Sequence, residues 1–321
     1  MINFKSSYAV LLDEYITFKK SIGFDMSNRY HWKDIDNFLE LHSSKERNLE
    51  ITEFQFKEWY KLRPNETLIN QYGRAIRLKQ FSMYLIIKGY KAFIPQYIKC
   101  PKSVFIPYIF STEEIKMLFT AADCLKSKKS SGSKEMGSII FRLLYSTGLR
   151  VSELLSIELC DLKLYEEIPH IVIRNTKNRQ DRLVVLSPSA LSVLQTYLKE
   201  RINGLSSFVF ISNKGNSITP PMVYDWFRKT LEIANIPHRG RRYGPCVHSL
   251  RHSFSVHSLH EMSNQGLDLY YCLPILSLFL GHKSLEATDK YVRLTAEIYP
   301  ELLKNMSTIS KIIYGGIINE K

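Results

Sequence analysis

Two prolines, Pro95 and Pro101, interrupt an otherwise largely helical pattern in this chain of 321 residues. Each proline removes a backbone hydrogen-bond donor and restricts the residue before it, so a helix cannot continue through this segment. A chain of this length also favours more than one compact core. We therefore predict a first domain at residues 1–95, a linker at residues 96–107 and a second domain at residues 108–321.

The first domain is predicted to be a small bundle of four helices. Apolar residues recur at helical spacing in residues 8–18 and 32–39, a third helical segment follows Ile51, and a fourth spans residues 67–88. The fourth segment also carries the basic residues Arg74, Arg77, Lys79 and Lys88. These side chains form either a solvated charged face or a contact with nucleic acid, and the pattern leaves both interpretations open.

The second domain is predicted to be mainly helical with a small antiparallel sheet. Ser111 and Glu114 have the spacing of a capping box, which opens a helix. Residues 126–134 are rich in Ser and Lys and are expected to form a basic loop. Residues 171–173 and 182–186 are mostly β-branched or aliphatic and are joined by a polar turn, as in two paired strands. The chain is thus expected to be mainly α, with a four-helix domain followed by an α+β domain.

The charge balance points to a polyanionic partner. Forty-four Lys and Arg residues against 31 Asp and Glu residues give a formal net charge of +13. Nucleic acid is favoured over a membrane surface because no amphipathic anchor stands out. Residues 201–250 are the most unbalanced, with seven positive and two negative side chains, and they include Arg239, Arg241 and Arg242.

Several other classes of protein are excluded by simple patterns. The apolar stretch at residues 273–280 is less than half the length that spans a bilayer. Asp13 and Glu14 precede any long apolar run, so the beginning of the chain does not resemble a signal peptide. The five cysteines are scattered and contain no CxxC pair, which favours reduced thiols over a disulfide framework or a zinc ribbon. We therefore expect a cytoplasmic location.

The first segment whose residues could take part in a reaction is residues 146–155, STGLRVSELL. Gly148 is expected to end one helix, with Arg150 in the first turn of the next and Glu153 one turn further on. A cation at a helix N-terminus is electrostatically unfavourable, unless it holds an anion together with the free N–H groups. The alternative is a local surface ion pair between Arg150 and Glu153, which contributes little to stability.

The second segment is residues 248–254, HSLRHSF. The spacing places His248 and Arg251 on one helix face, where an imidazole could move a proton beside a phosphate held by the guanidinium. A metal site on His248 and His252 is disfavoured, because Arg251 lies between them and no acidic or Cys ligand has the expected spacing. For His257 and His260, ordinary packing at the surface or in the core is the favoured interpretation.

The third and fourth segments are residues 280–291 and the turn at residues 175–179. Gly281 is expected to end a helix before His282, and Ser284 is a candidate N-cap for the helix that carries Thr288 and Tyr291. Tyrosine is more often a half-buried core residue than a nucleophile. Its usual pKa is about 10, so its hydroxyl needs cationic neighbours or a base before it can attack. The turn NTKNR is either simply solvated or inserts a charge into a DNA groove.

Taken together and in this order, the four segments resemble the signature boxes of the tyrosine recombinases, the family of phage integrases and Xer-like recombinases. The resemblance rests on TGLRVSEL, HSLRHSF, LGH and the tyrosine of LEATDKYVRL, and it covers residues from about 108 to 300. Residues 1–95 agree with the core-binding domain of that family only in being helical, basic and of suitable length.

The resemblance implies a role for each matching residue. Tyr291 would attack a DNA phosphate, Arg150 and Arg251 would hold its non-bridging oxygens, and His248 would be the acid/base histidine. His282 matches a phosphate-contacting position. Two further matches are Lys177, the lysine that protonates the departing 5′ oxygen, and Glu153, an acidic residue that supports the site.

The lysine turn departs from the family's usual Gly-Lys-Gly, because Thr176 and Asn178 flank Lys177 here. Arg179 is therefore a rival for its role. The basic residues expected to contact DNA are Arg74, Arg77, Lys79, Arg179, Arg239, Arg241 and Arg242.

The expected activity is site-specific DNA recombination through a covalent 3′-phosphotyrosine, without a metal or any other cofactor. The expected partner is double-stranded DNA with paired recombination sites, bound by a chain that is a monomer when free and a tetramer on DNA. An accessory recombinase or DNA-bending protein would be a further partner. A nicking-closing enzyme of the type IB topoisomerase kind, and a non-catalytic DNA-binding protein on the same fold, are the alternatives.

Overall fold

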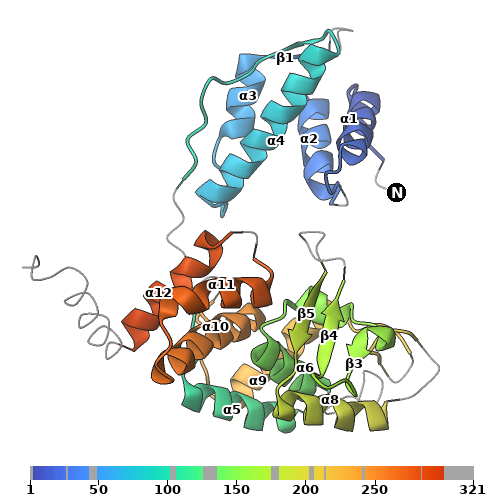
Figure 1. Cartoon of the computed structure of the whole chain (residues 1–321). Coiled ribbons are helices and arrows are strands. Elements are labelled where there is room, and N and C mark those ends of the chain that lie inside the picture. Colours follow the sequence, from blue (N-terminus) through green and yellow to red (C-terminus); the bar gives the residue numbers. More distant parts are fainter. Residues whose placement is uncertain are drawn as a thin grey trace, which may run out of the picture. The chain divides into compact units, whose positions relative to one another are not determined.

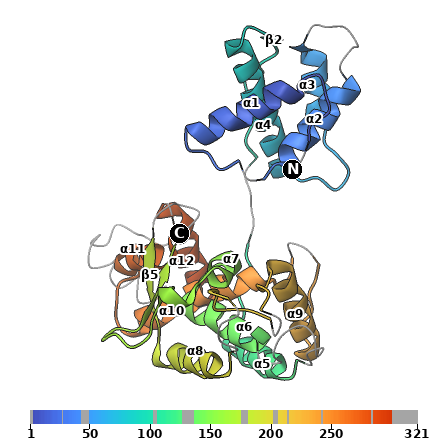
Figure 2. The ribbon, with the colours of Figure 1, turned by 90° about the vertical axis from the view of Figure 1, so that its right-hand side faces the viewer.

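The computed structural model divides the chain into two compact units, residues 1–105 and 106–321. The structure describes residues 3–26, 28–42, 49–101, 106–125, 136–174, 181–201, 206–212, 215–240, 243–282 and 284–299. Figures 1 and 2 show two views of the ribbon at right angles, and each unit is described by itself. No helix among the described residues is long and apolar enough to cross a bilayer.

The first unit is a four-helix bundle with one short pair of parallel strands. Its elements are α1 (Ala9–Ser21), α2 (Tyr30–His42), β1 (Glu50–Ile51), α3 (Glu53–Tyr60), α4 (Leu68–Ile87) and β2 (Lys91–Ala92). Aromatic side chains fill its core, where the ring of Tyr15 contacts Trp32, Phe81 and Tyr84 edge to face. Thr52 and Gln55 form a capping box at the start of α3.

The second unit combines helices with a three-stranded sheet. Its helices are α5 (Thr112–Asp123), α6 (Met136–Thr147), α7 (Val151–Leu155), η1 (Leu159–Asp161), α8 (Pro188–Glu200), α9 (Pro220–Ile233), α10 (Val247–Asn264), α11 (Leu269–Leu280) and α12 (Glu286–Ile298). Its strands are β3 (Leu162–Lys163), β4 (His170–Ile173) and β5 (Arg182–Val185), in the antiparallel order β3-β4-β5. The predicted mainly α class with a small antiparallel sheet is therefore confirmed.

Helix α6 lies at the centre of this unit. Its residues from Met136 to Phe141 are all buried, as expected for a helix that is apolar all round. It contacts α5, α8, α9 and α10, and α10 in turn packs against α11 and α12. The carboxyl end of α6 and the amino end of α10 are thereby brought together, although Thr147 and Val247 are 100 positions apart in the sequence.

The helix boundaries show which local sequence signals were sufficient to predict where a helix begins or ends. Ser111 and Glu114 form the predicted capping box, with Ser111 Oγ accepting a hydrogen bond from Glu114 N at 3.1 Å. Gly281 follows the last residue of α11 in the left-handed conformation (φ 66°), as predicted. The expectation that Ser284 caps α12 is wrong, because Leu285 holds the N-cap position and no side chain caps that helix.

Gly148 makes the tight corner between α6 and α7 and gives a prediction for stability. Its φ is +60°, and a Cβ at this position would lie 2.6 Å from Phe254 Cδ1 and 2.8 Å from Leu280 Cδ2. We expect Gly148→Ala to lower the free energy of unfolding by about 1–2 kcal/mol through backbone strain, and by a further ~1–3 kcal/mol through overpacking.

Gly266→Ala is the matched control for this experiment, because Gly266 has φ +82° and its added Cβ would have no neighbour within 4 Å. Denaturant unfolding of both variants separates strain from overpacking. Equal losses in the two variants would contradict the close packing around Gly148.

Candidate active site

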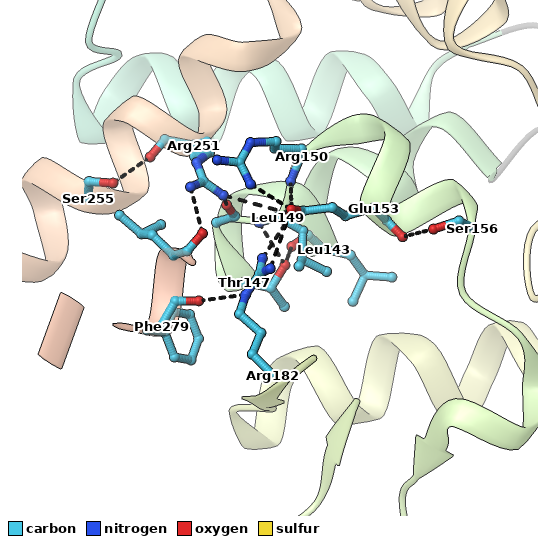
Figure 3. Close-up of polar contacts among 12 residues, drawn as sticks. Leu143, Thr147, Leu149, Arg150, Glu153, Ser156, Arg182, Arg251, Ser255 and Phe279 are labelled. Carbon is cyan, nitrogen blue, oxygen red and sulfur yellow. Dashed lines mark hydrogen bonds and ion pairs between the residues drawn. The ribbon is translucent and has the colours of Figure 1, made fainter. Parts of the chain in front are cut away.

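Four stretches that are distant in the sequence meet in the second unit. The corner between α6 and α7 contributes Arg150 and Glu153, β5 contributes Arg182, and α10 contributes Arg251. The fourth stretch, from the end of α11 through α12, contributes Tyr291. Figure 3 shows the side chains of Arg150, Arg182 and Arg251 converging on Glu153.

The carboxylate of Glu153 holds guanidinium groups from different segments. Its Oε1 accepts from Arg150 Nη1 at 2.6 Å, and its Oε2 accepts from the backbone N of Arg150 at 3.0 Å and from Arg182 Nη2 at 2.8 Å. Arg251 Nη1 lies 3.9 Å from the same Oε2. The predicted pair of Arg150 and Glu153 exists, but it is not a surface pair, because Glu153 is only 7% exposed.

Glu153 is ionised at neutral pH in spite of its burial. Burial alone would raise the pKa of this carboxyl, but the hydrogen bonds and charges of Arg182 and Arg150 outweigh it and lower the pKa from 4.5 to about 2. A carboxyl with a depressed pKa favours the folded state above its usual pKa. This contribution is lost as the pH falls through about 4.5 towards 2.

Arg251 is held by backbone carbonyls as well as by charge. Its side chain is 2% exposed, Nη1 donates to the carbonyl of Gly148 at 2.6 Å, and Nη2 donates to the carbonyl of Leu280 at 2.7 Å. Burial, followed by the positive charge of Arg150, lowers its pKa to about 10, so the guanidinium is still protonated at pH 7. Arg251 therefore fixes two helix ends and keeps a positive charge at the site.

The hydroxyl of Tyr291 lies beside this cluster. The side chain is 1% exposed, and its hydroxyl hydrogen-bonds to His252 Nδ1 at 2.8 Å. Burial raises the pKa of Tyr291, while the charges of Arg251 and Arg150 oppose that rise. The phenol is therefore protonated in the free protein, and two guanidinium groups are close enough to stabilise its phenolate.

The three histidines of the site are uncharged at neutral pH. His248 keeps an exposed edge but is surrounded by protein, and this desolvation, with the charges of Arg251 and Arg150, lowers its pKa to about 4. Desolvation is also the main cause for His252, with a pKa of about 2, and for His282, with a pKa of about 3. Each can therefore accept a proton or a hydrogen bond once a negative charge enters the site.

The structure brings most of the predicted catalytic residues together. They are Arg150, Glu153, His248, Arg251, His282 and Tyr291. The centroids of the stacked rings of His282 and Tyr291 are 6.2 Å apart, and those of His248 and His252 are 4.6 Å apart.

Further predicted residues are not among those that the structure brings together at the site. Four of them lie outside the described residues, namely Lys177, Arg179, Arg241 and Arg242. Arg239 is exposed in the segment after α9 and is not shown in contact with the site.

Two residues of the site were not predicted from the sequence. Arg182 has a usable signal, because it is opposite the buried Ile173 and two positions before the buried Val184, so it faces inward from β5. His252 was considered from the sequence only as part of a metal site that the neighbouring residues disfavour. Among the described residues, no group of three or more His, Cys, Asp or Glu side chains could hold a metal ion.

The predicted DNA contact by Arg74 needs correction. The side chain is buried, donates to Glu66 Oε1 and Oε2 at 3.0 and 2.8 Å, and lies over the ring of Trp59. It therefore supports the bundle from inside.

The other two basic residues of α4 that were expected to contact DNA are less buried. Lys79 is half-buried and donates to the carbonyl of Pro95 at 3.0 Å. Arg77 is half-buried and makes no hydrogen bond or ion pair with the residues that the structure describes.

Comparison with known proteins agrees with this site. Residues 109–297 match the phage integrase family. Tyrosine recombinase XerA of Pyrococcus horikoshii is 29% identical over 222 residues, which cover 68% of this chain and 67% of that protein. Tyrosine recombinase XerC of Staphylococcus saprophyticus is 26% identical over 300 residues, covering 91% of this chain and 86% of that protein.

Two solved structures share the fold. The XerH site-specific recombinase bound to difH aligns with a TM-score of 0.63 and 20% identity, over 88% of this chain and 79% of that one. A lambda integrase fragment, solved as a dimer bound to a COC′ core site, aligns with a TM-score of 0.61 and 16% identity, over 88% and 94%. The chain belongs to the phage integrase family. It is a tyrosine recombinase, an enzyme of DNA strand exchange.

Proposed function

We propose that this protein is a site-specific DNA recombinase that cuts and rejoins DNA through a covalent bond to Tyr291. One observation carries the proposal. The hydroxyl of Tyr291 is hydrogen-bonded to the neutral His252, and the charges of Arg251 and Arg150 favour its phenolate. A phenol needs such neighbours to become a nucleophile near neutral pH.

The reaction is the one that the family resemblance implies, and the charges of the described site support it. The phenolic oxygen of Tyr291 forms a bond to phosphorus while the bond from phosphorus to the 5′ oxygen breaks, leaving a 3′-phosphotyrosine and a free 5′-hydroxyl. Arg150 and Arg251 neutralise the charge that develops on the non-bridging oxygens. The phenolic proton of Tyr291 passes to the acid/base histidine, His248. His282 contacts the phosphate, and Lys177 protonates the departing 5′ oxygen. Because the link to tyrosine is itself a diester, rejoining the strand needs no nucleotide.

The test is covalent capture of DNA. A pool of nicked duplexes with randomised sequence is incubated with the full chain, denatured, and searched for DNA strands that stay attached to protein. We expect an attached strand that maps to Tyr291 by mass spectrometry, and the recovered sequences then define a substrate. Strands joined between two duplexes support recombination. Relaxation of supercoiled DNA without a partner site would support the nicking-closing alternative, and DNA binding without attachment would support the binding-protein alternative.

We also propose that the first unit contacts the DNA backbone through Arg77. Arg77 is attracted by Asp34 and Glu66 but forms no hydrogen bond with them or with any other described residue, so its guanidinium can still donate to a phosphate. Each phosphate contact adds about 0.9 to the slope of log affinity against log salt. Arg77→Ala should weaken duplex binding for all sequences and reduce that slope by about 1. Lys57→Ala is the control, because exposed Lys57 is paired with Glu53 on α3. An unchanged salt dependence in Arg77→Ala would contradict the contact.

A further inference from the structure

Arg182 is the residue of the site to which neither the sequence motifs nor the proposed reaction gives a role. It is the first residue of β5, and its side chain is only 9% exposed. Its Nη1 and Nη2 donate to Glu153 at 3.3 and 2.8 Å, and its Nε donates to the carbonyl of Phe279 at 3.1 Å. One guanidinium thus joins a strand, the helix α7 and the end of α11 (Figure 3).

The corner after α11 leaves room for this guanidinium. Gly281 has φ +66°, and a Cβ at this position would lie 2.8 Å from Arg182 Nη1 and 3.0 Å from its Cζ. His282, the next residue, packs its ring on Tyr291. Arg182 therefore lies directly beneath the turn that leads to the nucleophile, in addition to contacting Glu153.

The geometry also separates the tasks of the three arginines. The side chain of Arg150 is half-exposed. Arg251 donates hydrogen bonds to two backbone carbonyls, whereas Arg182 donates to the carboxylate of Glu153 and to the carbonyl of Phe279. Without Arg182, the buried carboxylate would keep Arg150 and the more distant Arg251 as its charged partners. If the carboxylate of Glu153 shifted by a fraction of an ångström, the guanidinium of Arg150 that is hydrogen-bonded to it would shift too, and a small misplacement of this kind slows a reaction.

We infer that Arg182 is a positioning residue for strand cleavage, which holds Glu153 so that Arg150 and Arg251 are placed for the phosphate. This inference rests on the proposed function for its kinetic consequences. Arg182 itself does not touch DNA or the reacting atoms. Its effect should consequently appear in the rate of cleavage and not in the affinity for the duplex.

The experiment compares Arg182→Gln, Arg182→Lys and a matched control, Arg142→Gln. Arg142 also forms a bidentate pair, with Asp123, but it lies on α6 away from the site. Single-turnover cleavage of the duplex selected by the natural protein should fall on the order of 10- to 100-fold in Arg182→Gln. Duplex affinity should change less than about twofold. Arg182→Lys keeps the charge without the fork and should lie between, and Arg142→Gln should cleave normally.

The pH profile distinguishes positioning from a general loss of structure. The charged or titratable groups that interact with Glu153 are Arg150, Arg182, Arg251 and His248. The hydrogen bond to Arg182 is the main reason for the low pKa of Glu153. In Arg182→Gln the pKa of Glu153 rises, so the cleavage rate should fall more steeply than normal as the pH is lowered from 7 to 5. A variant that is merely less well folded would lose the same fraction of its rate at every pH.

A double-mutant cycle tests whether Arg182 acts through Glu153. Adding Arg182→Gln to Glu153→Gln should cost much less than it costs in the natural protein. Full additivity, a normal cleavage rate in Arg182→Gln, or a loss of binding as large as the loss of cleavage would each overturn the inference.

One readout does not depend on cleavage at all. The Nε–H resonance of Arg150 in an NMR spectrum should shift in Arg182→Gln and stay unchanged in Arg142→Gln. If the natural protein formed no covalent adduct, the proposed function would fail, and this resonance would still decide whether Arg182 orders the site.

Discussion

Tyr291→Phe should abolish the covalent attachment of DNA while leaving a folded protein that still binds duplex. The change removes one oxygen, which is the atom that bonds to phosphorus, so no residual adduct is expected. The change leaves the buried Nδ1 of His252 without its partner, which should lower the free energy of unfolding by about 1–3 kcal/mol. Denaturing electrophoresis of the reaction with a labelled nicked duplex measures the adduct, and thermal unfolding measures the fold.

Tyr271→Phe is the control for this experiment. Tyr271 lies on α11 and is 83% exposed, so its hydroxyl is solvated and far less constrained than that of Tyr291. The control should form adduct at the normal rate. An adduct that persists in Tyr291→Phe and disappears in Tyr271→Phe would transfer the role of nucleophile to α11 and refute the proposed mechanism.

Arg251→Ala and Arg150→Ala should both stop cleavage, but the first should weaken the fold more than the second. Loss of one charge-stabilising donor from a transition state typically costs about 100- to 1,000-fold in rate. Arg251 also satisfies the carbonyls of Gly148 and Leu280, and leaving buried groups of this kind unpaired costs about 1–3 kcal/mol each. Arg150 is half-exposed at the start of a short helix, and its removal leaves no such carbonyl unpaired.

Both arginine variants should still bind duplex DNA, because one phosphate among many contributes little of the total affinity. Cleavage rates, duplex affinity and denaturant unfolding are measured on the same preparations. Equal losses of binding and of cleavage would contradict a role confined to the reacting phosphate. Equal stability of the two variants would contradict the structural role of Arg251.

Much of the architecture could be predicted because local signals agree with the tertiary fold. The Ser111–Glu114 capping box, the strands around Ile171 and Val184, and the left-handed Gly281 were all read correctly from short patterns. Strand β3 was missed, because two residues carry no detectable alternation. The N-cap of α12 was misplaced, because Ser284 offers the right side chain but Leu285 begins the helix without a cap.

The candidate site shows where sequence reasoning ends. Arg150 and Glu153 are close in sequence, so their pairing was foreseeable, but the burial of that pair depends on α10 and β5. The contacts of Arg182 with Phe279 and of His252 with Tyr291 span 97 and 39 residues, and no local pattern specifies them. Arg74 was misread for the same reason, since its basic character gave no hint of Glu66 and Trp59 closing over it.

The grip of Arg251 on two backbone carbonyls has a consequence for protein engineering. The same guanidinium that faces the reaction also secures the ends of α6 and α11. Heat tolerance and turnover therefore depend on one side chain, and changes that repack the neighbourhood of Gly148 or Leu280 will alter both properties together. Directed evolution for a hardier version of this enzyme should accordingly find its gains in the outer layers of the molecule, away from this junction.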